Sequence, residues 1–163
     1  MRVGGRWLAL GGAALAAAAL VAALRPVTVL EVENAARART FRAALGSDEP
    51  FWVVSQHSMY DQPVTEEFVA DGGRIRLEAV SSPSAAVREY FGILAPGERH
   101  AVRRAMAEIV FRVAAGTPQR LRVGGVERSF LELGEHGDRL VMRAARRPAL
   151  ACWLAGGRGG AAR

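Results

Sequence analysis

The chain has 163 residues, enough for one domain of ordinary size. Its formal net charge is +6, but arginine and glutamate alternate along several segments, so the clustered basic footprint of a nucleic-acid-binding protein is missing and we expect no nucleic acid partner. A single cysteine, Cys152, excludes an internal disulfide. It lies beside Trp153 and Leu154, where we expect a small apolar residue rather than a nucleophile.

The N-terminal segment has the pattern of a membrane-targeting sequence. Arg2 and Arg6 precede the uncharged run at residues 7–24, WLALGGAALAAAALVAAL, which reaches the lower length limit of a membrane-spanning helix. Because the arginines should stay in the cytoplasm, we predict a signal anchor over residues 1–25, with a single pass of the inner membrane and the rest of the chain in the periplasm. The small residues at 21–23 also permit cleavage as a signal peptide, which would release the chain into the periplasm.

Short alternating segments dominate the next part of the chain, residues 26–147, and predict β-strands. We expect strands at 26–33, 39–43, 51–58, 64–70, 74–80, 109–113, 120–123, 126–131 and 139–145. Asp71-Gly72-Gly73 and Gly124-Gly125 predict tight hairpin turns.

The remaining segments predict little regular structure. Residues 85–91 predict a short helical turn or a loop lid, and residues 98–106 have a helix-forming composition. Residues 148–163 form an apolar and then Gly/Arg-rich tail, which we expect to be disordered. The fold class is therefore mainly β, a small antiparallel β-sandwich or partly closed barrel preceded by one N-terminal hydrophobic signal-anchor helix.

Residues 51–80 contain the polar side chains that packing alone explains least well. Neighbours on a strand point to opposite faces, so Ser58 is poorly placed for His57 to act as its base, and no Gly-x-Ser-x-Gly context surrounds it. None of the three histidines has the ligand spacing of a zinc site, so we expect no metal and no cofactor.

Two interpretations of these residues stay open. In the first, His57 and Glu66 pair and fix the turn between their strands. In the second, a polar pocket that binds a small ligand or a partner loop is formed by His57, Ser58, Glu66 and Arg88. Aromatic side chains that could form the walls of such a pocket are Trp52, Tyr60, Tyr90 and Phe91.

The segment HSMYDQPVTEEFVADGGRIRLE, residues 57–78, resembles the signature of the domain-of-unknown-function family numbered 1850. The positions that match its pattern are His57, Ser58, Pro63, Val64, Glu66 and Glu78. The resemblance continues through residues 80–93 and 120–146. It implies a loop that enters a strand over residues 98–106, in place of the helix that their composition favours. It also implies a cell-envelope protein that is often encoded beside TRAP-type uptake transporters of the TAXI class.

Together these observations predict a membrane-anchored extracytoplasmic accessory or binding module linked to TRAP-type solute uptake. Its expected partners are the membrane, through the N-terminal helix, and a TRAP-type permease or solute-binding protein. The alternative is an envelope hydrolase or metal-dependent enzyme that uses His57 and Glu66. A third candidate is a purely structural membrane-bound module.

Overall fold

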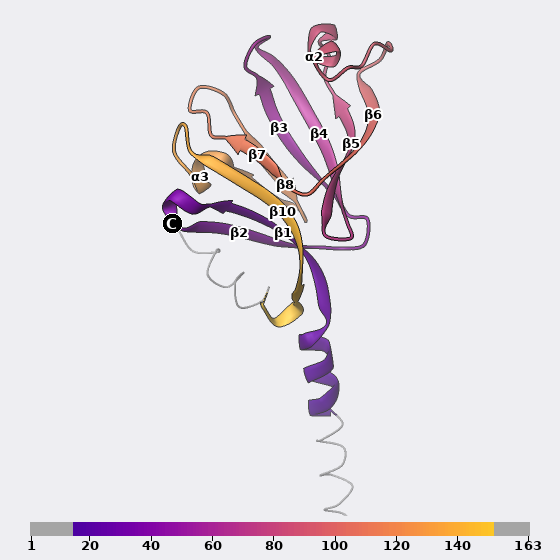
Figure 1. Ribbon diagram of the computed structural model, residues 1–163, viewed down its shortest axis with the longest axis vertical. Helices are drawn as coiled ribbons and strands as arrows, with labels where there is room; N and C mark the ends of the chain where they lie inside the picture. The colour runs from indigo at the N-terminus through magenta and orange to yellow at the C-terminus, as the bar shows by residue number, and fades with distance from the viewer. Residues whose placement is uncertain (1–14, 152–163) are drawn as a thin grey trace, which may run out of the picture.

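The computed structural model describes residues 15–151, which form ten strands in two antiparallel sheets (Figure 1). The prediction of a mainly β chain is confirmed, and the two sheets fit a β-sandwich. The four-stranded sheet has the order β2-β1-β10-β7, and the six-stranded sheet has the order β6-β5-β4-β3-β8-β9.

The strands of the four-stranded sheet are β1 (Pro26–Asn34), β2 (Arg39–Leu45), β7 (Ile109–Arg112) and β10 (Arg139–Pro148). Those of the six-stranded sheet are β3 (Pro50–His57), β4 (Gln62–Asp71), β5 (Arg74–Ser81), β6 (Arg99–Met106), β8 (Arg120–Val123) and β9 (Val126–Ser129). The short helices are η1 (Ala35–Arg37), α2 (Ala85–Tyr90) and α3 (Phe130–Leu133).

The alternation of the sequence explains the single core between the sheets. In β1, Leu30 and Val32 are fully buried while Glu31 and Glu33 lie on the other face. In the six-stranded sheet Phe51 of β3 stacks on Phe68 of β4, with ring centroids 5.4 Å apart, and both rings are buried in the same core. Apolar side chains of both sheets therefore form one shared hydrophobic core.

One connection joins the edges of the two sheets. β6 is an edge of the six-stranded sheet and β7 an edge of the four-stranded sheet, and only Ala107 and Glu108 separate them. Residues 98–106, expected as a loop that enters a strand, are strand from Arg99 onward. The alternation there is blurred because Arg103 has a positive φ of 55° and the β5–β6 register shifts between Leu77 and Ala79.

The segment predicted as a strand through residue 131 turns into a helix two residues early. Ser129 caps α3 in a capping box, since its side chain accepts from the backbone of the first turn and Glu132 reaches back to the N–H of Ser129. The Ser-x-x-Glu spacing that produces this cap is a recognisable motif of the sequence. β10, in contrast, continues three residues beyond its predicted end, to Pro148.

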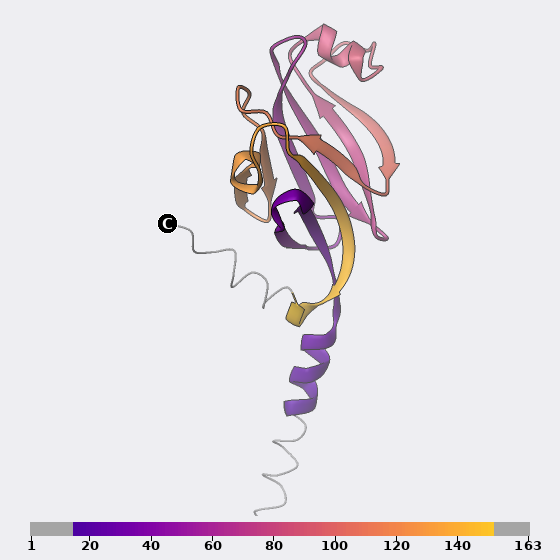
Figure 2. The same ribbon diagram turned by 60° about the vertical axis from the view of Figure 1, so that its left-hand side comes forward.

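Both ends of the described chain leave the β-domain on the same side. Residues 15–24 are helical and lead into β1, and the backbone N–H of Ala149, after β10, donates to the carbonyl of Arg25 at 3.0 Å (Figure 2). No helix within residues 15–151 is long and apolar enough to cross a membrane. The predicted anchor lies partly, and the predicted disordered tail mostly, outside the described residues.

Candidate functional site

His57 belongs to an aromatic cluster at the end of the domain that carries α2, opposite the helix of residues 15–24 (Figure 1). Its ring stacks on Tyr60, with centroids 5.1 Å apart, and meets Tyr90 of α2 edge-on at 4.6 Å. Tyr90 in turn meets Phe91 at 5.6 Å. We call His57, Tyr60, Tyr90 and Phe91 the tip cluster. It joins the end of β3 to Tyr90, the last residue of α2, thirty-three residues later in the chain.

The loop after β3 fixes the orientation of the histidine. The carbonyl of His57 accepts the N–H of Asp61 at 2.8 Å, which closes a tight turn. Within this turn the N–H of Met59 donates to His57 Nδ1 at 3.4 Å. That bond requires an unprotonated Nδ1, so in the neutral ring the hydrogen lies on Nε2.

Arg88 attaches α2 to the ends of β4 and β5. Its guanidinium donates to the carbonyls of Ser82 and Pro83 at 3.0 and 3.1 Å. The buried Ser82 hydroxyl donates to the carbonyl of Pro63 at 2.8 Å, which ties the same corner to the start of β4. The role of Arg88 is therefore to position the helix that carries Tyr90.

Several large apolar side chains are exposed beside the tip cluster. Tyr90 is 63% exposed and Leu94, four residues further on, is 86% exposed, while Met59 projects from the turn after His57. Ser58 is exposed in the same turn and has no hydrogen bond within residues 15–151. The sequence analysis named the two tyrosines and Phe91 but missed Met59 and Leu94. Neither amino-acid composition nor hydrophobic periodicity predicts that these two side chains are exposed.

Glu66 lies apart from the tip cluster, on the core side of the six-stranded sheet. It is opposite Val53 of β3 and Val80 of β5, and directly opposed residues of antiparallel strands point to the same face. Both valines are fully buried. Within residues 15–151 the Glu66 carboxyl makes no hydrogen bond or ion pair, and burial raises its pKa to about 7.

The predicted contact between His57 and Glu66 is wrong. His57 is opposite Gln62 across the β3–β4 pair, whereas Glu66 is opposite Val53, four residues before His57. The predicted pocket of His57, Ser58, Glu66 and Arg88 is consequently divided: three of these residues lie at the tip, and Glu66 does not. Trp52 is not a wall of it either, because Trp52 and His57 differ by an odd number of positions on β3 and face opposite sides.

Each of the other two histidines makes one hydrogen bond, to a backbone group. His100 Nε2 lies 2.8 Å from the carbonyl oxygen of Gly97, and His136 Nδ1 accepts the N–H of Ala115 at 3.2 Å. Over residues 15–151, no three His, Cys, Asp or Glu side chains gather as a metal site would require.

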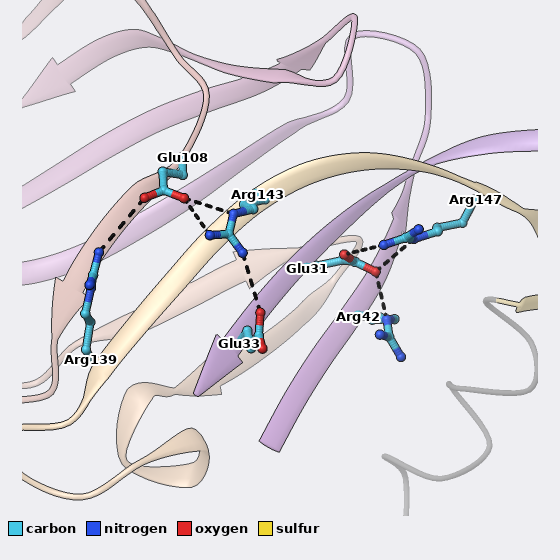
Figure 3. Close-up of polar contacts among 7 residues, drawn as sticks. All are labelled: Glu31, Glu33, Arg42, Glu108, Arg139, Arg143 and Arg147. Atoms are coloured by element: carbon cyan, nitrogen blue, oxygen red, sulfur yellow. Dashed lines mark hydrogen bonds and ion pairs between the residues drawn. The ribbon is translucent and has the colours of Figure 1, made fainter. Parts of the chain in front are cut away.

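A ladder of ion pairs covers the outer face of the four-stranded sheet (Figure 3). Glu31, only 15% exposed, accepts hydrogen bonds from Arg42 at 2.9 Å and from Arg147 at 3.1 Å, and these bonds lower its pKa against the effect of burial. Arg143 joins Glu108 at 2.6 Å. The full ladder consists of Glu31, Glu33, Arg42, Glu108, Arg139, Arg143 and Arg147. The four arginines of the ladder share three carboxylates, so most of the charge on this face is paired. Arg112, opposite Arg139 on the same face, donates instead to the carbonyl of Gly137.

A polar junction not predicted from the sequence links β1, η1 and the start of β10. Asp138 accepts hydrogen bonds from Arg37 Nε, from Asn34 Nδ2 at 2.9 Å and from the N–H of Glu135 at 2.9 Å. These hydrogen bonds lower the pKa of Asp138 to about 2, and the bond from Arg37 contributes most to the shift. Asn34 is buried and also donates to the carbonyl of Leu133, so the junction fastens α3 to the four-stranded sheet.

Searches of protein-family models, of curated proteins and of solved structures find no match to this chain.

Proposed function

We propose that the protein is a binding module of the cell envelope, held at the inner membrane by residues 1–25, whose tip cluster docks onto a protein partner in solute uptake. The observation that carries this proposal is the exposed aromatic and apolar surface around Tyr90, at the opposite end of the domain from the apolar helix of residues 15–24 (Figure 1). A tether at one end leaves the other end free to reach a partner.

The exposed side chains of that helix support a lipid environment for the N-terminal segment. Leu15 is 75% and Val21 71% exposed, and Leu20 and Leu24 are exposed as well. Each large apolar side chain left in water forgoes roughly 1.5–3 kcal/mol of burial free energy. A bilayer would recover that free energy, and Arg2 and Arg6 would set the orientation with the β-domain in the periplasm.

The chemistry of the tip favours a protein partner. Aromatic side chains that are rigid and partly exposed are the usual centres of protein–protein binding energy, and contiguous exposed apolar groups mark such surfaces. The tip cluster adds a hydrogen-bond donor, His57 Nε2, beside Tyr60 and Tyr90. The resemblance to family 1850 suggests the identity of the partner, a permease or solute-binding protein of a TRAP-type system.

The alternative, an envelope hydrolase or metal-dependent enzyme, needs His57 and Glu66 in one site. The register of β3 and β4 separates these two side chains, so we favour binding over catalysis.

Site-specific crosslinking in membranes of the native host tests this proposal. A photo-crosslinking amino acid at position 90 should yield a covalent adduct with a TRAP permease or solute-binding protein, identified by mass spectrometry. The same amino acid at position 131, an exposed leucine on α3, is the matched control and should yield none. Equal adducts at both positions, or no adduct at position 90, would refute the docking surface.

The tether and the surface can be tested separately. A periplasm-active reporter fused after Arg163 should be active in the full chain, and a reporter that is active only in the cytoplasm should be silent. For the surface, Tyr90→Ala should abolish the adduct formed by a crosslinker at position 94 and leave the melting temperature nearly unchanged, because the Tyr90 side chain is mostly exposed.

A further inference from the structure

A groove lies on the outer face of the six-stranded sheet, away from the tip cluster. Trp52 of β3 is opposite Arg122 of β8, and Arg122 is opposite Glu127 of β9, so the three side chains form a row across neighbouring strands. With Thr65 of β4 and the exposed Val126 of β9 they line a groove of about 480 Å³. This volume is within the range of small-molecule sites.

The indole of Trp52 is the apolar wall of this groove. Trp52 is half-buried, and within residues 15–151 its ring makes no stacking or cation–π contact. Arg122, the nearest candidate for such a contact, instead directs its Nε to Glu127 at 2.6 Å, and Arg120 donates to the other oxygen of Glu127 at 2.9 Å. The ring therefore remains available to a ligand, next to a fixed set of charged hydrogen-bonding groups.

We propose that this groove binds a pyranose ring of a neutral glycan chain. A pyranose has a face of C–H groups, which packs on an aromatic ring, and a rim of hydroxyl groups, which hydrogen-bond in the plane of the sugar. Trp52 would take the C–H face. The hydroxyls would meet the remaining donors of Arg122, the carboxylate of Glu127 and the hydroxyl of Thr65, which has no hydrogen bond within residues 15–151.

The charges of the groove favour a neutral sugar over a nucleic acid. The two arginines hold the pKa of Glu127 below its ordinary value, with the hydrogen bond from Arg122 as the largest cause, so the carboxylate is ionised at neutral pH. A phosphodiester stacked on Trp52 would lie beside this negative charge and would have to share the guanidinium groups of Arg120 and Arg122 with it. A hydroxyl group, in contrast, can donate to the carboxylate.

Isothermal titration calorimetry of the full-length chain tests the proposal. The probes are the tetrasaccharides of β-1,4-linked N-acetylglucosamine, β-1,4-linked glucose and α-1,4-linked glucose, with a thymidine tetranucleotide as the competing class. We expect at least one sugar to bind with a Kd between micromolar and millimolar. Trp52→Ala should weaken it at least about tenfold, whereas Trp52→Phe, which keeps an aromatic face, should change it by less than about threefold.

A matched control and a second variant keep the test decisive. Val110→Ala, on β7 in the other sheet, should leave the affinity unchanged. Should Trp52→Ala fail to melt cooperatively, Glu127→Gln, which removes only the charge, should still weaken the sugar by more than about threefold. Absence of binding by all three sugars, equal affinity in the folded Trp52 and Glu127 variants, or tighter binding of the tetranucleotide would each overturn the proposal.

Discussion

Replacing Glu66 with leucine should stabilise the protein at alkaline pH. The side chain is half-buried on the core face of the sheet, opposite Val53 and Val80, and has no partner in the described part of the chain. Burial raises its pKa from 4.5 to about 7. Below pH 4.5 the group is neutral in both the folded and the unfolded chain, so its titration costs no stability. As the pH rises from 4.5 through 7, the unfolded chain ionises first, and the folded state loses stability.

The size of this loss follows from the two pKa values. Each pH unit between them corresponds to 1.36 kcal/mol, so the folded state should be less stable by about 3 kcal/mol above pH 8 than below pH 4.5 because of this one group. Glu66→Leu removes the titration and adds apolar surface next to the two valines. Its advantage over the wild type should therefore grow by about 3 kcal/mol across that pH range.

Urea unfolding at pH 4.5, 6, 7 and 8 provides the measurement, with ΔG compared at each pH. The matched control is Glu67→Gln, the next residue of β4, which lies on the opposite face and pairs with Arg99 at 2.9 Å. Since that ion pair is on the surface, its loss should cost less than about 1 kcal/mol. Parallel pH profiles for the wild type and Glu66→Leu, or a less stable variant at pH 8, would refute the burial argument.

Three further predictions concern the rest of the fold. Asp138→Asn should lower the melting temperature above pH 4, and the difference from the wild type should vanish as the pH falls toward 2. The reason is that the hydrogen bonds that lower the pKa of Asp138 contribute stability only while its carboxyl is ionised. Thermal melts between pH 2 and 6 measure this difference, and a difference that stays constant with pH would contradict the prediction. His57→Ala and Glu66→Leu should be additive within about 0.5 kcal/mol in a double-mutant cycle, since the side chains lie apart, so larger coupling would disprove the strand register. Ser129→Ala should cost about 1 kcal/mol in chemical unfolding through loss of the capping box, and an unchanged midpoint would mean that α3 does not depend on its cap.

Alternation along the sequence was sufficient to predict nine of the ten strands within residues 15–151 and the two glycine hairpins. The Gly72-Gly73 and Gly124-Gly125 turns have positive φ at both positions, as tight hairpins require. β6 was harder to predict because a bulge at Arg103 breaks its alternation. The short helix α3 was missed although Ser129 and Glu132 have capping-box spacing, because a β-rich run precedes it.

The site was predicted less well than the fold, for a geometric reason. In an antiparallel pair each step away from the turn moves both partners by one residue, so the turn after His57 places Glu66 opposite Val53. Counting residues outward from that turn along both strands would have shown that His57 and Glu66 are not opposite each other. Because Trp52 and His57 are an odd number of positions apart on β3, alternation would also have placed Trp52 on the opposite face of the sheet from His57. No local pattern, however, indicates that Tyr90 packs on His57, since that contact depends on how α2 folds back over the sheet.

The position of β1 has a mechanical consequence. β1 emerges from the helix of residues 15–24 and is hydrogen-bonded on both sides, to β2 over residues 28–34 and to β10 over residues 26–33. A pull on the N-terminal helix, opposed by a load at the tip cluster, would act along the strand and shear both ladders at once. A pull that separates the two chain ends would instead peel β1 from β10 one residue at a time, beginning at Pro26 and Pro148. The domain should therefore withstand a much larger force applied between the N-terminal helix and the tip cluster than a force applied between its two chain ends.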